Sequence, residues 1–290
     1  MKKLVATLAI AALVIFAASA SGSSESEYEK TIRALDKDGI VDIKTDVPQI
    51  TVIRSSNSDR GSVVLSGNGK SNYNMTVSES HGNLTVKIKH QNRWFFRFLG
   101  SSSAELTVTL PGSWKNGDLL LDSVSGSINI LDPVSADRLE ASTVSGAIRF
   151  ESINDSENVN FSTVSGKIEG DEIVAKRATI ESVSGAIEID DIQVDSQNLL
   201  KVTTVSGRIK LPNIKSDKVF VESVSGAIEC HLPSQYTGRL KVKTVSGAIK
   251  TSLTSRVYES SENRTRSYTF GDGNGSIEIS TTSGAISIVE

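Results

Sequence analysis

The sequence predicts an all-β fold, a parallel β-solenoid of the β-helix-like kind with coils of about 20 residues. The phrase Ser-Gly-x-Ile occurs eight times between residues 125 and 286, and successive copies are 20, 20, 19, 22, 19, 21 and 37 residues apart. Apolar and polar residues alternate on both sides of the phrase. A period near 20 residues is typical of solenoids, in which each repeat stacks on its neighbours because it cannot bury its apolar face alone.

Each repeat is predicted to be a strand, a corner and a second strand. Before the copy at Gly146, Leu139 and Ala141 alternate with polar residues, and Ile148 and Phe150 do the same after it. A period of two indicates strands. The frequent Val, Ile and Thr favour strands as well, and no comparable segment shows helical spacing.

The Ser-Gly phrase is interpreted as the corner of each coil. Glycine adopts the positive φ that a sharp bend can demand, and the preceding serine can bond the local backbone. The Val before the serine and the Ile after the glycine are expected to stack on their equivalents in neighbouring coils, ~4.8 Å away. The structural corner glycines are Gly126, Gly146, Gly166, Gly185, Gly207, Gly226, Gly247 and Gly284.

Charges on the outward positions support parallel stacking in register. The residue after each Ile is polar, and oppositely charged neighbours are expected at Arg149–Glu169, Glu188–Lys210, Lys210–Glu229 and Glu229–Lys250, with one like-charged pair at Glu169–Glu188. Exposed pairs contribute only ~0–1 kcal/mol each, so they help to define register more than they add stability.

Residues 1–20 have the features of a signal peptide. Lys2 and Lys3 precede an apolar run from Leu4 to Ala18, and small residues follow up to Ala20. This pattern predicts export, to the periplasm, the cell surface or the medium, with no membrane span after cleavage. The alternative is an uncleaved anchor, although the run is short for a spanning helix of ~20 residues.

The rest of the chain divides into two regions. Residues 27–115 alternate like strands but lack the phrase, so they are predicted to form an irregular N-terminal β region that caps the solenoid. Residues 116–290 are predicted to form the repeat solenoid, with a polar loop insertion at about 254–272. The final copy, around Gly284, is expected to form the last coil.

The densest aromatic cluster is the segment RWFFRF at 93–98, in a chain with only 5 % aromatic residues. If any stretch is a contact site, this segment is the first candidate, as an exposed loop that touches a membrane, a glycan or a protein partner. The alternative is that Trp94 and Phe96 pack on the N-terminal cap. The candidate binding residues are Arg93, Trp94, Phe95, Phe96 and Arg97.

No catalytic residue, metal site or cofactor is predicted. Eight equivalent serines cannot all be nucleophiles, and the phrase lacks the first glycine and the helix of a nucleophile elbow. The three histidines are scattered, with no second ligand at metal-binding spacing. The best enzyme candidate is the acidic group Asp190, Asp191 and Asp195, since a carbohydrate-active enzyme would need converging acids; the alternative is a solvated turn.

Two further features limit the chemistry. The net charge is −3 and no basic stretch stands out, which argues against a nucleic-acid partner. The single cysteine, Cys230, excludes an internal disulfide and is predicted to be a small buried hydrophobic residue.

Several motifs together resemble a bacterial family of adhesin-like proteins of unknown function. They are the leader, the segment VTLPGSW, the repeated TVSGAI and the closing YTFGDGNGSIEISTTSGAISI, and the resemblance covers about residues 40–290. It implies an exported β-solenoid of the cell envelope without catalytic residues. The predicted function is a non-catalytic binding or adhesion module with a protein or glycan partner at the envelope. The alternatives are a periplasmic scaffold or envelope-stress sensor, and a carbohydrate-active enzyme.

Overall fold

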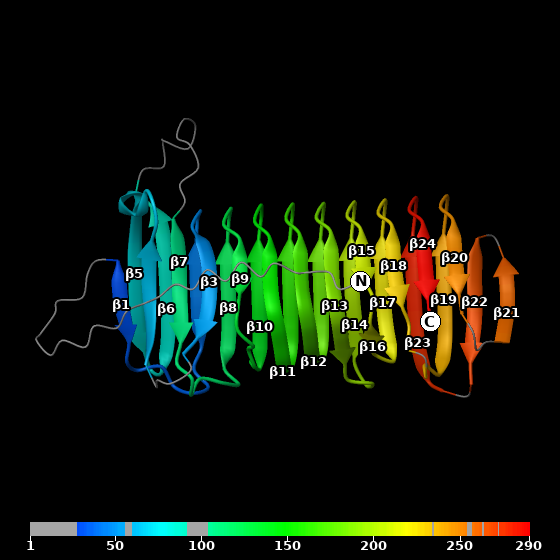
Figure 1. Cartoon of the computed structure of the whole chain (residues 1–290), viewed down its shortest axis with the longest axis horizontal. Helices are drawn as coiled ribbons and strands as arrows, with labels where there is room; N and C mark the ends of the chain where they lie inside the picture. The colour runs from blue at the N-terminus through cyan, green and yellow to red at the C-terminus, as the bar shows by residue number, and fades with distance from the viewer. Residues whose placement is uncertain are drawn as a thin grey trace, which may run out of the picture.

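The chain folds into a rod built of β-strands. The computed structural model describes residues 28–55, 60–91, 104–233, 235–253, 257–262, 264–271 and 273–290. Within these residues there are 24 strands and one short 3-10 helix, η1 (Lys70–Asn72). The strands lie side by side across the long axis of the molecule and are joined by backbone pairing from end to end (Figure 1). The predicted all-β solenoid is confirmed.

Two faces run along the rod, named here by their relation to the corner. The entry face holds the strands that precede each corner: β8 (Asp118–Ser123), β10 (Arg138–Thr143), the ends of β11 (Ile148–Thr163) and β12 (Ile168–Ser182), β14 (Leu199–Thr204), β17 (Lys218–Ser223), β23 (Gly275–Thr281) and β19 (Gly238–Thr244). The exit face holds the strands that follow it: β9 (Ile128–Ile130), the starts of β11 and β12, β13 (Ile187–Val194), β15 (Ile209–Leu211), β18 (Ile228–His231), β24 (Ile286–Val289) and β20 (Ile249–Ser252). The two-residue strand β16 (Ile214–Lys215) pairs with the end of β13, near the edge opposite the corners.

The core consists of identical positions stacked from coil to coil. Leu139 of β10 pairs in parallel register with Leu119 and with Val159. Seven of the eight isoleucines that follow the corner glycines are buried and stack in the same way, as predicted: Ile128, Ile148, Ile168, Ile187, Ile209, Ile228 and Ile286. Each coil adds the same buried layer, so the same pattern of apolar residues recurs in the sequence once per coil.

The hydroxyl that builds each corner belongs to the residue three positions before the glycine. The Gly146 N–H donates to Thr143 Oγ1 at 3.1 Å, and Thr143 Oγ1 donates to the carbonyl of Gly126 in the preceding coil at 3.1 Å. All eight glycine N–H groups have this bond to a buried Ser or Thr. The serine next to the glycine, to which the sequence analysis assigned this role, is exposed.

The corner glycines are required for space and not for a positive φ. None of the eight is among the described residues with positive φ. A Cβ built on Gly166 would lie 1.7 Å from the carbonyl oxygen of Gly146, and one on Gly185 would lie 1.6 Å from that of Gly166. The predicted reason was therefore wrong. Adjacent corners stack so closely that a side chain at this position would collide with the backbone of the next coil.

The corner hydroxyls give a testable prediction. Thr163→Val keeps the side-chain shape but removes the partner of the Gly166 N–H and a donor to the Gly146 carbonyl. Leaving a buried backbone group without a partner costs ~1–3 kcal/mol, so we expect the free energy of unfolding to fall by about 2 kcal/mol. Denaturant unfolding measures it. Ser165→Ala, at the exposed serine of the same corner, should leave the free energy unchanged, and equal losses in both variants would contradict the assignment.

The coil nearest the N-terminus lies inside the rod. β2 (Val41–Thr45) pairs in parallel with β8 on one side and with β6 (Asn83–His90) on the other. β3 (Gln49–Arg54) lies between β9 and β7 (Glu105–Leu110). Residues 41–54 thus form a coil without the Ser-Gly phrase, so the change of sequence pattern near residue 115 is not a break in the sheets. Antiparallel strands cover this end of the rod: β5 (Tyr73–Ser80), β4 (Gly61–Ser66) and β1 (Glu29–Ile32).

The C-terminal coil is also inserted inside the rod. β23 lies between β17 and β19, and β24 lies between β18 and β20, as the red strands of Figure 1 show. The expectation that the final copy forms the last coil is therefore wrong. In the predicted loop at about 254–272, the described residues form an antiparallel hairpin, β21 (Val257–Glu262) and β22 (Thr265–Phe270), which continues the entry face beyond β19.

Candidate functional site: an exposed edge of valines

The corners form one long edge of the rod, which we name the corner edge. It carries a row of valines, each between 44 % and 55 % exposed. They were predicted to stack on their equivalents in neighbouring coils, and they follow one another from coil to coil, but each faces outward. Leu139, Ala141 and Thr143 point inward, so the same alternation directs Val144 outward, and the sequence already contained this signal. The row is Val124, Val144, Val164, Val183, Val205, Val224 and Val245, with Thr282 of the inserted coil between the last two.

The backbone of the corner edge is held by hydrogen bonds between successive coils. The Ser145 N–H donates to the carbonyl of Val124 at 3.1 Å, and the Ser165 N–H donates to that of Val144 at 3.0 Å. The same bond links the later corners. The Val and Ser side chains are therefore displayed on a fixed backbone. The backbone of the corners forms the regular row of turns along the upper side of Figure 1.

A shallow groove runs along the entry-face side of these valines. Val144, Val164 and Val183 line one side, and the outward side chains Asp122, Ser142, Ser162, Glu181 and Thr203 line the other; the hollow measures about 470 Å³. A second hollow of about 400 Å³ adjoins it on the entry face and shares Asp122, Ser142, Ser162 and Glu181. The corner edge thus offers an apolar row beside a polar one over several coils.

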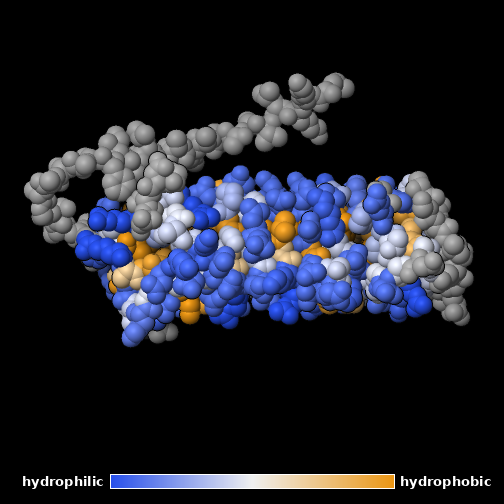
Figure 2. Space-filling model, turned by 90° about the horizontal axis from the view of Figure 1, so that it is seen from below, coloured by the Kyte–Doolittle hydropathy of each residue, from blue (hydrophilic) through white to orange (hydrophobic). Residues whose placement is uncertain are grey.

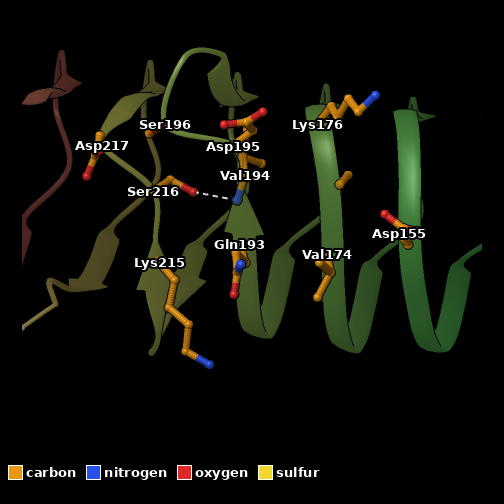
Figure 3. Close-up of a pocket in the computed structure, with 11 residues that line it drawn as sticks. Asp155, Val174, Lys176, Gln193, Val194, Asp195, Ser196, Lys215, Ser216 and Asp217 are labelled. Atoms are coloured by element: carbon orange, nitrogen blue, oxygen red, sulfur yellow. Dashed lines mark hydrogen bonds between the residues drawn. The ribbon is translucent and has the colours of Figure 1, made fainter.

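The opposite edge has a hollow of about 470 Å³ with charged residues from several coils. In Figure 3 Lys176 and Asp195 project to one side and Lys215 to the other. Asp155 comes from β11, and Asp217 lies two residues after Lys215 in the same coil. Figure 2, which views the rod from below, shows a mostly hydrophilic surface with small apolar areas. The charges are spread along this edge, so they do not meet at one reacting point.

The predicted acidic group has structural contacts. Asp191 accepts hydrogen bonds from Lys215 Nζ, at 2.8 Å, and from the Asn213 amide. Asp190 is exposed on β13. Asp195 is exposed and lines the hollow beyond the end of that strand. The hydrogen bond that the Lys215 ammonium donates to Asp191 raises the pKa of this lysine. The ion pair is solvent-exposed and links two neighbouring coils, so its role is structural.

The charged residues on the exit face lie in the predicted column, with one correction. Arg149 Nε lies 2.6 Å from Glu169 Oε1, as expected. Lys167 bridges the like-charged pair, 2.7 Å from Glu169 and 2.7 Å from Glu188, and these hydrogen bonds raise the pKa of Lys167. Burial alone would raise the pKa of Glu169, but hydrogen bonds from Lys167 and Arg149 hold it below its usual value. Glu229 does not neighbour Lys250, because Ser287 of the inserted coil lies between them.

The remaining predicted site residues have separate outcomes. The binding candidates Arg93, Trp94, Phe95, Phe96 and Arg97 lie outside the described residues, as does the leader at 1–20. Cys230 is buried, as predicted, and desolvation raises the pKa of its thiol to about 12. In the described part of the chain, no three His, Cys, Asp or Glu side chains form a group that could hold a metal ion. No helix there has the length and apolar character needed to cross a bilayer.

Comparisons with known proteins found a matching family model and several similar solved structures. The model of the Toastrack DUF4097 family matches residues 40–289. A "putative lipid binding protein" from Parabacteroides distasonis is 15 % identical at a TM-score of 0.49, over 90 % of this chain and 96 % of that one. A "putative adhesin" from Bacteroides fragilis is 14 % identical at 0.47, over 92 % and 99 %. No curated protein sequence matches the chain.

Proposed function

This chain belongs to the Toastrack DUF4097 family, and from that premise we propose that it is a non-catalytic binding module of the adhesin kind, exported to the bacterial cell envelope. The observation that carries the proposal is the corner edge, where seven valines are about half exposed in a single row. Contiguous exposed apolar surface beside polar residues marks an interaction site. A partner that covers the valines removes apolar surface from water, and this lowers the free energy of the complex.

The repeat explains how such a module works. A catalytic centre is built once, from different side chains that converge, whereas this edge presents the same Val-Ser pair in coil after coil. A weak contact made at several adjacent coils adds up to a strong one, provided that the presenting surface is rigid. The coil-to-coil hydrogen bonds of the corners supply that rigidity.

The envelope location rests on the leader at residues 1–20, which has the pattern of a signal peptide. The first test is therefore protease treatment of intact cells that carry a tag at the C-terminus of the protein. Loss of the tag from intact cells is expected for an adhesin on the surface. Protection until the outer layer is opened would point instead to a periplasmic scaffold, and a cytoplasmic location would overturn the proposal.

A binding measurement tests the contact surface. Purified protein is expected to adsorb to isolated envelopes of the bacterium that makes it, and Val164→Lys with Val183→Lys is expected to reduce adsorption at least about 10-fold, because burying a charge there is unfavourable. The matched control is Leu131→Lys with Leu199→Lys, at exposed apolar residues away from the corner edge. The variant Trp94→Ala with Phe96→Ala tests the other candidate surface. Equal adsorption by wild type and the valine variant would contradict the proposal.

A further inference from the structure

We propose that the corner edge is covered by a second copy of the same chain, so that two rods associate antiparallel, edge against edge. The proposal rests on the proposed function, because it names the partner of the same surface. It makes the module homophilic: a rod displayed by one cell can bind a rod displayed by another. Area, charge and side-chain size each favour this occupant.

The available area is sufficient for a specific dimer. The row runs over eight coils, about 34 Å at a coil spacing of ~4.8 Å. Its seven half-exposed valines alone present roughly 500 Å² per copy, within the range of the largest apolar patches of monomers. Two copies would together bury about 1,000 Å², the lower limit for a specific interface. Both edges have the same spacing, so each coil of one row can face one coil of the other along the whole length of the row.

The charges beside the valines select an antiparallel arrangement. The outward column next to the edge reads, in spatial order, Asp122, Ser142, Ser162, Glu181, Thr203, Glu222, Ser280 and Lys243. When one copy is reversed about the centre of this column, Asp122 of each copy lies opposite Lys243 of the other. No residue of the column then lies opposite a residue of the same charge. Both side chains are exposed. Complementary charges at the ends of an interface define its register.

Side-chain size on the exit-face side of the edge agrees with the same register. The residue after each corner glycine is small in most coils, but Lys167 and Arg208 are long. In the antiparallel arrangement Lys167 faces Ala227 and Arg208 faces Ala186, so each long side chain meets a small one. A parallel arrangement brings the entry-face side of one copy against the exit-face side of the other and pairs no opposite charges.

The first experiment measures the association state of the full-length purified protein by sedimentation equilibrium over a wide concentration range. A dimer is expected, and Val164→Lys with Val183→Lys should raise its Kd at least about 100-fold, since two charges are placed in each half of the interface. Leu131→Lys with Leu199→Lys should leave the Kd unchanged. An unchanged melting temperature in each variant shows that the rod still folds.

The second experiment tests the register by charge reversal. Asp122→Lys and Lys243→Asp should each raise the Kd by about 10-fold, because like charges then face each other, and the double variant should restore the wild-type Kd. A double variant as weak as the single ones contradicts the antiparallel register. Ser142→Ala controls for the hydrogen bond that Ser142 donates to Asp122.

Other occupants of the edge give distinct results. A wild-type protein that is monomeric at every concentration overturns the dimer, and so does a dimer that the valine variant leaves intact. A monomer whose wild type binds vesicles of phosphatidylethanolamine and phosphatidylglycerol, while the valine variant does not, would assign the edge to a membrane. The protease test of location is independent of these outcomes, so a failed dimer and a failed envelope function are distinguishable.

Discussion

Gly185→Ala is expected to destabilise the protein by at least about 3 kcal/mol, at the upper end of the range for overpacking. The new Cβ would lie 1.6 Å from the carbonyl oxygen of Gly166 and 2.9 Å from Ser182 Oγ. The nearest atom belongs to backbone that is itself stacked on the preceding corner, so it cannot move away without separating two coils. Denaturant unfolding monitored by circular dichroism measures the loss.

The control for this prediction is Ser184→Ala, one residue earlier in the same corner. Ser184 is exposed, so the free energy of unfolding of the Ser184→Ala variant should stay within about 0.5 kcal/mol of the wild-type value. A Gly185→Ala cost of 1 kcal/mol or less, the usual scale of a backbone-propensity effect, would mean that the neighbouring coils do separate easily. The stacking explanation of the repeated glycine would then be wrong.

Ile286→Ala is expected to cost about 3–4 kcal/mol, the loss typical of a buried isoleucine replaced by alanine. Ile286 belongs to the last copy of the phrase, yet it is 1 % exposed and lies in β24 between β18 and β20. Removing its side chain leaves a cavity between two coils. A large loss from a substitution four residues before the last residue of the sequence is the direct consequence of the inserted coil.

The matched comparison is Ile249→Ala, the same position of the phrase in β20. This isoleucine is only partly buried, because β20 pairs with β24 and, within the described residues, with no other strand. We expect a cost of about 1 kcal/mol, since less of the side chain is removed from water. If coils stacked in chain order, Ile286 would be outermost and the two costs would be reversed, so one pair of unfolding curves decides the order.

Much of the local structure could be predicted from the sequence alone. The 20-residue period, the strands on either side of each corner and the buried isoleucines follow from backbone geometry, because a strand alternates its side chains wherever it occurs. The same alternation, followed from Leu139 through Thr143 to Val144, also indicates that the valines face outward. The repeated phrase therefore contains the information that predicts the exposed edge.

The tertiary structure alone decided which coil lies beside which. The phrase is nearly the same in every copy, so its copies stack on one another equally well and the sequence carries no local signal for their order. That order places Ser287 between Glu229 and Lys250 and brings Thr282 into the row of valines. The need for glycine at the corner also depends on the tertiary structure, because the atom that excludes a side chain there belongs to the neighbouring coil. Local alternation is determined within a strand, whereas neighbours and close approach depend on pairing between distant segments.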